Sequence, residues 1–416
     1  MARWNSIARG AAVTAVATLA LTACSSDGDG GGEGSSEPLM IGSLLPQTGS
    51  LAFLGPPEIA GVDLAVEEVN ENGGVLGQDM EVTHTDSADT ENPQIATQSV
   101  SGLISDGVSA IIGAASSSVT FNVIDDITNN GVVQVSPANT ATGLSGYSDY
   151  YFRTAPPDTV QGNALANLMM EDGHMNVGIL VFNDDYGTSL RDVIQDTVEG
   201  AGGTLTYGES GSEFDPNASN FATDVGAVLE TNPDAIAVIA FDQTIRIVPE
   251  LIAAGFPAEN LYFTDGNTAD YSGDFEPGTL TGAKGTIPGA NAADDFKARL
   301  DGAHGSELDS YAYGAESYDA TLLIALAAVR GEGTDADTIQ ANLAAVSGAE
   351  GGTECTGFAE CADLLADGEE ITYQAVGGSG PFNAANDPSS AFIGVYEFDE
   401  NNAPQWTNAV FGEVPE

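Results

Sequence analysis

Short apolar runs alternate with longer amphipathic runs along most of the chain, beginning at Leu39. The apolar runs have strand length, whereas the amphipathic runs have the spacing of helices. This alternation predicts parallel sheets with helices on both faces. The expected strands lie in LMIGSLLP, MEVTHTDSA, SAIIGA, VVQVSPA, NVGILVFN, TLTYGES, AIAVIAF and NLYFTDG. The expected helices lie in IAGVDLAVEEVNENGG, NPQIATQSVSGLISDG, SSVTFNVIDDITNNG and TSLRDVIQDTVEGAGG, and at residues 159–172, 219–231 and 244–254.

The alternation restarts after residue 158, and 416 residues are too many for one hydrophobic core. We therefore expect two α/β lobes, each with its own sheet. Ligands of open α/β sheets bind outside the carboxyl ends of the strands. Two facing lobes would present their strand-end loops to one shared cleft.

The N-terminus has the layout of a secretory signal, because two arginines precede a short apolar stretch that ends in small residues. The run LTAC, which ends at Cys24, resembles the bacterial lipobox, whose cysteine is lipidated and becomes the new N-terminus. We predict a lipoprotein signal peptide over residues 1–23 and a lipid on Cys24. A flexible linker rich in Gly, Ser and acidic residues is expected over residues 24–38. The mature protein would be anchored to the outer face of the cytoplasmic membrane.

The charge balance is strongly acidic, with 62 Asp and Glu against 9 Lys and Arg and a formal net charge of −53. Such a chain repels phosphate backbones and anionic headgroups, which argues against a nucleic-acid partner. The acids could attract a cationic ligand or could keep the surface hydrated in a saline medium. Their even spread along the chain favours the second interpretation.

Two cysteines remain beyond Cys24, and Cys355 and Cys361 are six residues apart. A zinc site would need two further ligands, and the three histidines are isolated along the chain. Outside the cell a disulfide that closes a small loop is the favoured outcome.

Catalytic motifs are missing from the sequence. It contains no Walker A loop, no dinucleotide-binding glycine fingerprint, no HExxH and no GxSxG. Carboxylates are so abundant that a glycosidase-like pair stays open. We expect no enzyme activity, no cofactor and no metal.

Polar residues follow several of the expected strands. Ser117 opens a helix after SAIIGA, and Thr140 follows VVQVSPA, so the two hydroxyls could face one anion. Simple helix capping is the alternative for the serine. Tyr186 and Asp265 occupy strand-end positions in the second lobe, where a carboxylate could bind an ammonium group. An Asp-Gly turn is the alternative for Asp265.

The order of these motifs resembles the solute-binding lipoproteins of branched-chain amino-acid ABC uptake systems, which have the type I periplasmic-binding fold. The similarity covers about residues 39–400. The stretches that carry it are IGSLLPQTGSLAFLGPPEIAGVDLAVEEVNENGGVLGQDMEV, GVSAIIGAASSSVT, GVVQVSPANTAT, YYFRTAPPDTVQG, VFNDDYGTSLRD and YGAESYDATLLI.

The resemblance implies a role for each site residue. The ligand α-carboxylate would be held by Ser117, by the backbone of Ala138 and by Thr140. The ammonium group would be held by Asp265, with help near Asp158.

The resemblance also implies the walls of the pocket. Tyr186 would close over the ligand, and the ligand side chain would be lined by Phe53, Leu54 and Phe241. Leucine binders of the family often have an aromatic residue at the position of Leu54 and Glu at that of Asp265, so the ligand is not named as leucine.

The family fold is α/β, with two Rossmann-like lobes joined by a hinge of three crossings. We place the crossings in residues 152–158, near 283–285 and near 371–373. Lobe 1 would then comprise residues 39–157 plus about 285–370. Lobe 2 would comprise residues 158–284 plus about 371–416, including a β-rich C-terminal tail.

The function implied by the resemblance is binding of a small polar ligand, most simply an amino acid or a related amide or carboxylate. The loaded protein, expected as a monomer, would deliver the ligand to a membrane permease of an ABC transporter. A tethered sensor that signals to a receptor or regulator is the alternative, and the sequence does not separate the two roles.

Overall fold

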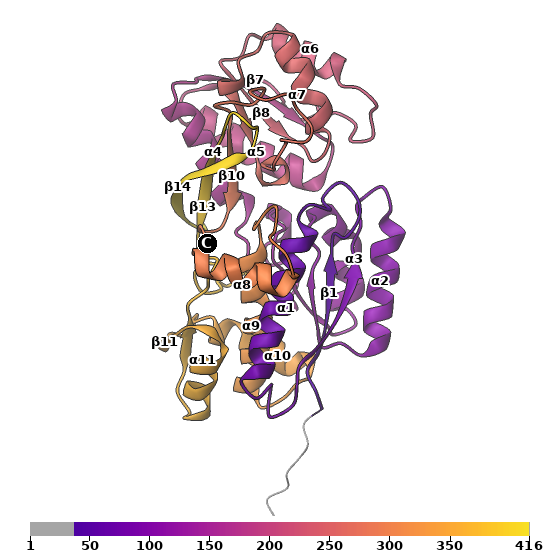
Figure 1. Cartoon of the computed structure of the whole chain (residues 1–416), viewed down its shortest axis with the longest axis vertical. Coiled ribbons are helices and arrows are strands. Elements are labelled where there is room, and N and C mark those ends of the chain that lie inside the picture. The colour runs from indigo at the N-terminus through magenta and orange to yellow at the C-terminus, as the bar shows by residue number, and fades with distance from the viewer. Residues whose placement is uncertain (1–36, 416) are drawn as a thin grey trace, which may run out of the picture. The chain divides into compact units, whose positions relative to one another are not determined.

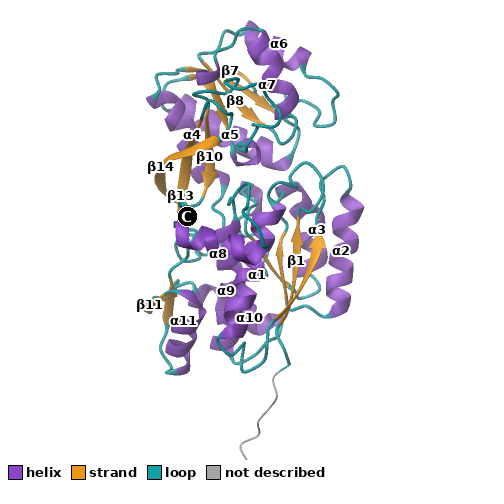
Figure 2. Ribbon diagram, viewed as in Figure 1, coloured by secondary structure: helices purple, strands orange, loops and turns teal. Residues whose placement is uncertain are grey.

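The computed structural model describes residues 37–415. The predicted signal peptide, Cys24 and all but the last two residues of the predicted linker lie outside this range. Within it the chain forms two large β-sheets and one two-stranded sheet, with helices packed around them (Figure 2).

The first sheet has five strands in the order β2-β1-β3-β4-β5, and each neighbouring pair is parallel. Its strands are Met40–Leu45 (β1), Glu81–Asp86 (β2), Ala110–Gly113 (β3), Val133–Ser136 (β4) and Tyr151–Arg153 (β5). The helices between these strands are Gly55–Glu71 (α1), Pro93–Asp106 (α2) and Ser117–Thr128 (α3) (Figure 1).

Both faces of the first sheet are buried, as the alternation of side chains along a strand requires. Ile41 and Leu45 of β1 belong to a core cluster with α1 and the later helices, whereas Leu44 belongs to a cluster with α2 and α3. The predicted parallel sheet with helices on both faces is confirmed for this lobe, which we call lobe 1.

Four further helices pack in lobe 1. Gly314–Gly331 (α9) is buried along most of its length and packs against α1. The others, with the two-stranded sheet, are Asp294–His304 (α8), Ala336–Val346 (α10), Gly357–Ala366 (α11), Thr353–Cys355 (β11) and Ile371–Tyr373 (β12).

The second sheet has seven strands in the order β14-β13-β10-β9-β8-β6-β7, and with its helices it forms lobe 2. Pairs from β10 to β7 are parallel, whereas β13 and β14 are antiparallel to their neighbours. The strands are Asn176–Val181 (β6), Thr204–Tyr207 (β7), Ala235–Ile239 (β8), Leu261–Phe263 (β9), Lys284–Pro288 (β10), Ser390–Phe398 (β13) and Pro404–Glu413 (β14). The helices are Asp158–Glu171 (α4), Asp185–Gly200 (α5), Ala222–Glu230 (α6) and Thr244–Ala253 (α7).

Strand pairing places two of the three crossings later in the chain than we expected. Lys284–Pro288 pairs with β9 and β13, so it lies in the second sheet and the chain leaves lobe 2 only after Pro288. Ile371–Tyr373 pairs with β11 and packs in the lobe 1 core, so the return to lobe 2 comes between β12 and β13. The first crossing falls between β5 and α4, inside the expected segment.

Cys355 and Cys361 form a disulfide that joins β11 to α11. Both cysteines are buried in the core cluster of lobe 1. The bridge therefore anchors a short segment of lobe 1 to its core.

Over residues 37–415, no helix combines the length and the apolar character that crossing a bilayer would need. The same part of the chain brings together no group of three or more His, Cys, Asp or Glu side chains able to hold a metal ion.

Candidate functional site

The carboxyl ends of β3 and β4 bring two polar loops of lobe 1 together, because these strands are neighbours in the sheet. Ser116 caps α3 by accepting a hydrogen bond from the Val119 N–H at 3.3 Å. The Ser117 hydroxyl accepts from the backbone N–H groups of Thr140 and Ala141 at 3.3 and 3.2 Å. The start of a helix and a second loop thus meet at one point, which is a favourable place for an anion.

Hydrogen bonds to Ser136 hold the second loop, which follows β4, in its conformation. The Ser136 hydroxyl donates to the Ala114 carbonyl at 2.7 Å and accepts from the Asn139 N–H at 3.1 Å. The Thr140 hydroxyl is buried and has no hydrogen-bond partner within residues 37–415. A buried hydroxyl that is left unpaired in this way is available to a ligand.

Lobe 2 contributes a carboxylate between two phenols. Tyr186, in the first turn of α5, donates to Asp265 Oδ1 at 2.6 Å. Tyr313 donates to Asp265 Oδ2, also at 2.6 Å. Burial raises the pKa of Asp265, although the two phenol hydrogen bonds favour its ionised form. An added cation at this position would stabilise the carboxylate further.

Tyr313 was not predicted as a site residue, although its OH comes from lobe 1 to meet Asp265. It immediately precedes α9 with a left-handed φ of 60°, an uncommon conformation for a tyrosine. The only sequence signal was the Tyr-Gly pair at the start of the stretch YGAESYDATLLI.

Seven of the nine predicted ligand residues line one cavity. They are Leu54, Ser117, Ala138, Thr140, Tyr186, Phe241 and Asp265. The Phe241 ring stacks on Tyr186 with centroids 5.7 Å apart and an interplanar angle of 15°. The structure adds Leu51, Ala115, Ser116, Asn139, Gly266 and Tyr313. The space among these residues is about 20 Å³, room for a single water molecule.

Phe53 and Asp158 are not among the residues that line this cavity. Phe53 is half-buried and packs against the core cluster that includes Leu54. Asp158 is fully buried at the start of α4, where its N–H donates to the Thr140 carbonyl at 2.7 Å. Asp158 is the first residue of the helix that follows the first crossing. It therefore lies behind the loop that carries Thr140.

Asp158 should make stability depend on pH. Burial raises its pKa to about 7. An unfolded aspartate has a pKa of about 3.9, so the native state holds an extra proton between about pH 4 and 7 and loses stability as the pH rises through that window. We expect Asp158→Asn to be more stable than the native protein at pH 8.

The size of this gain and its pH dependence provide the test. The advantage of Asp158→Asn should grow by on the order of 1–2 kcal/mol between pH 5 and pH 8, measured by urea unfolding at constant salt. Asp335→Asn, at an exposed helix cap where hydrogen bonds from Thr338 lower the pKa of the native residue, is the control and should lose stability at both pH values. An Asp158→Asn advantage that does not change with pH would contradict the assignment.

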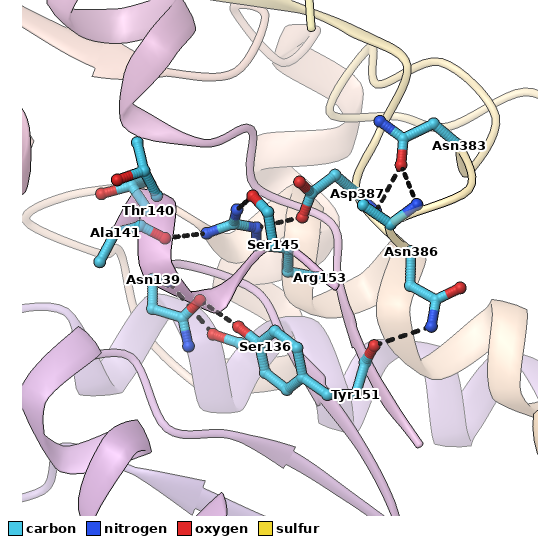
Figure 3. A network of polar contacts seen from close by, with 12 residues as sticks. Ser136, Asn139, Thr140, Ala141, Ser145, Tyr151, Arg153, Asn383, Asn386 and Asp387 are labelled. Atoms are coloured by element: carbon cyan, nitrogen blue, oxygen red, sulfur yellow. Dashed lines mark hydrogen bonds and ion pairs between the residues drawn. The ribbon is translucent and has the colours of Figure 1, made fainter. Parts of the chain in front are cut away.

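A buried arginine near the hinge supports the loop that carries Thr140. Figure 3 shows Arg153 between Ala141 and Asp387, with Ser145 close to its guanidinium. Its Nε donates to Asp387 Oδ1 at 2.6 Å, and its Nη1 donates to the Ala141 carbonyl at 3.0 Å. Arg153 and Asp387 are 0% and 2% exposed.

Two neighbouring contacts connect the same segment to the loop (Figure 3). Asn386 donates to the Tyr151 carbonyl at 3.1 Å, and the Tyr151 hydroxyl donates to Asn139 Oδ1 at 2.5 Å. The third crossing segment thus positions the loop that carries Thr140.

Direct hydrogen bonds also join the two lobes beside the cavity. The Ser118 hydroxyl donates to Asp185 Oδ2 at 2.9 Å, and the Thr142 N–H donates to the Ser189 hydroxyl at 2.9 Å. Lobe 1 offers hydroxyl and backbone donors, and lobe 2 offers a carboxylate. The arrangement suits a small molecule with an anionic group and a cationic group.

A family model described as "Periplasmic binding protein" matches residues 38–368. The chain belongs to this family. The resemblance to branched-chain amino-acid-binding proteins that the sequence indicated is therefore confirmed, and so is the fold of two α/β lobes.

Individual relatives of this periplasmic binding protein agree with the family. The chemotactic signal transduction system substrate-binding protein BasB of Halobacterium salinarum is 28% identical over 371 residues, covering 86% of each chain. The Leu/Ile/Val-binding protein BraC3 of Rhizobium johnstonii is 25% identical over 369 residues, covering 87% of this chain and 92% of its own. The crystal structure of LivJ from Streptococcus pneumoniae, in complex with isoleucine, has a TM-score of 0.73 and 21% identity, covering 91% of this chain and all of its own.

Proposed function

We propose that this periplasmic binding protein captures a zwitterionic amino acid between its lobes and delivers it to the permease of an ABC transporter. The observation that carries the proposal is the pairing of Asp265 in lobe 2 with the Ser117 and Thr140 loops of lobe 1 around one cavity. The α-carboxylate would accept from the lobe 1 donors, and the ammonium group would contact Asp265.

Binding must be coupled to movement of the lobes, because a space of about 20 Å³ is far too small for an amino acid. A hinge through the three crossings would open the cleft and close it again around the ligand. The ligand favours the closed form only through contacts that both lobes make to it at once.

A thermal-shift screen with the twenty amino acids, amides, urea and aromatic acids tests the proposal. A ligand that binds the native state raises the melting temperature as its concentration exceeds the dissociation constant. Stabilisation by one or a few zwitterionic amino acids, isoleucine among the first to try, would support it. Stabilisation only by acids without an amino group would remove Asp265 from its proposed role.

The double variant Ser117→Ala with Thr140→Ala tests the carboxylate half of the site. We expect affinity to fall at least about a hundredfold, since each lost hydrogen bond to a charged group contributes about 1.5–3 kcal/mol. Calorimetric titration with the amino acid found in the screen measures the change. Ser105→Ala, at an exposed serine of α2, is the control. Unchanged affinity in the double variant would show that the ligand carboxylate lies elsewhere.

A sensory role is the second candidate, favoured by the similarity to the chemotactic protein BasB over 86% of both chains. Both roles need the same binding site, so a variant such as Asp265→Asn should disable either one. Uptake of labelled amino acid and movement towards that amino acid, compared in cells with and without the gene, distinguish the two roles.

Binding without chemical turnover is part of the proposal. Ser43, His84 and Asp63 form a hydrogen-bonded chain of the residue types found in hydrolase triads, with distances of 2.8 and 2.9 Å. Ser43 is 0% exposed, so no substrate can reach its hydroxyl. The relatives described above are also named as binding proteins.

We further propose that the protein acts outside the cytoplasmic membrane as a monomer held by a lipid on Cys24. The LTAC run and the family membership support this placement. In cells, Cys24→Ser should release the protein from the membrane fraction without changing its ligand affinity. A Cys24→Ser protein that stays with the membrane fraction would contradict the anchor.

A further inference from the structure

A second and larger cavity lies beside the ligand cavity, and Tyr313 lines both. Its volume is about 390 Å³, within the range of small-molecule sites. Its walls come from residues 287–292 around the second crossing, from the segment that leads into α9, and from the β13–β14 hairpin. It is thus built from both lobes at the hinge.

One wall holds a carboxylate that has no side-chain partner. Glu316 is 4% exposed, and no side chain within residues 37–415 donates to its carboxylate. Two glycines in the segments that connect the lobes make room for this side chain. A Cβ on Gly289 would lie 2.3 Å from Glu316 Oε1, and a Cβ on Gly377 would lie 2.8 Å from it. A buried carboxylate that lines a cavity and has no side-chain donor gains by meeting a positive charge there.

Four aromatic residues also line the cavity, namely Tyr311, Tyr313, Tyr396 and Trp406. Tyr396 and Trp406 pack edge to face with centroids 5.5 Å apart. Lys297 Nζ lies 5.5 Å from the centroid of Tyr311 while it donates to Asn291 Oδ1 at 2.8 Å. An ammonium group therefore already lies over one ring of this wall, an arrangement favoured by the ring quadrupole.

We propose that this cavity binds a small organic cation, an ammonium or guanidinium compound, against Glu316 and the surrounding aromatic rings. Asp270 and Asp309 also line the cavity, so acidic side chains outnumber the single Lys297 and an anion is disfavoured. Apolar ring faces suit an organic cation better than a strongly hydrated metal ion. This site is separate from the amino-acid site, so the proposal stands independently of the proposed function.

Trp406 allows the site to be tested directly, because it is the only tryptophan in residues 37–415. Tetramethylammonium chloride is titrated into the full-length protein carrying Trp4→Phe, which leaves Trp406 as its single tryptophan, while sodium chloride is lowered to keep a high total salt concentration. High salt suppresses the general attraction of cations to the acidic surface. We expect saturable changes in Trp406 fluorescence and one bound probe per chain in equilibrium dialysis.

Glu316→Gln should weaken the probe roughly tenfold or more, because the carboxylate is lost while the shape of the side chain is kept. Glu397→Gln is the matched control, since Glu397 is exposed on the same strand as Tyr396 and points to the opposite face. Dialysis that detects no saturable binding would overturn the proposal. Saturable binding that Glu316→Gln leaves unchanged would also overturn it. Neither result depends on whether amino acids bind between the lobes.

Discussion

Asp265→Asn should lower the affinity for a zwitterionic amino acid by at least about a hundredfold. The ligand ammonium would lose its charged partner in a site that both lobes bury, and such a loss typically costs about 2–5 kcal/mol. Asparagine keeps the shape of the side chain and still accepts hydrogen bonds from Tyr186 or Tyr313. Because burial raises the pKa of Asp265, the variant should be at least as stable as the native protein at neutral pH.

Calorimetric titration with isoleucine and with 3-methylpentanoate, its analogue without the amino group, would isolate the ammonium contact. The variant should lose the preference for isoleucine over the analogue, whereas Glu397→Gln should keep it. Affinity of the native protein for isoleucine should also fall as the pH drops through the raised pKa of Asp265, and the variant should lack this dependence. A variant that still prefers isoleucine would place the ammonium group elsewhere.

The sequence could predict where the main site residues lie, because a residue that directly follows a strand can be recognised from the local pattern of the chain. Ser117 and Thr140 each follow a strand, and neighbouring parallel strands end at the same edge of the sheet. Tyr186 and Asp265 follow β6 and β9 in the same way. Their contribution to binding remains a prediction, whereas their meeting around one cavity is observed.

What the sequence did not reveal depends on long-range packing. Tyr313 reaches Asp265 from a loop 48 residues later in the chain and from the other lobe. The strand Lys284–Pro288 was missed because it contains Gly and Pro, which weaken a strand pattern. Its Gly285 is needed where the backbone passes Thr268, since a Cβ there would lie 2.2 Å from the Thr268 hydroxyl.

The buried ion pair of Arg153 and Asp387 is another feature that no local pattern predicts, because 234 residues separate its partners. Asp387→Ala should destabilise the protein by about 3–5 kcal/mol, since it leaves the guanidinium buried without a counter-charge. Glu350→Ala is the matched control, because it removes an exposed carboxylate 3.7 Å from Arg330, which keeps its ion pair with Glu370, and it should cost at most about 1 kcal/mol. Urea unfolding at neutral pH and constant salt measures both changes.

Affinity separates the positioning role of this pair from its effect on stability. Asp387→Asn keeps an acceptor for Arg153 and should fold, yet a less firmly held Arg153 would loosen its hydrogen bond to the Ala141 carbonyl beside Thr140. We therefore expect weaker isoleucine binding in Asp387→Asn under conditions where the variant is fully folded, and unchanged binding in Glu350→Ala. The double replacement Arg153→Met with Asp387→Leu should recover much of the stability without recovering the affinity, because it removes the buried charges but not the need for a support beneath the loop. Full affinity in that double variant would show that the pair only stabilises the fold.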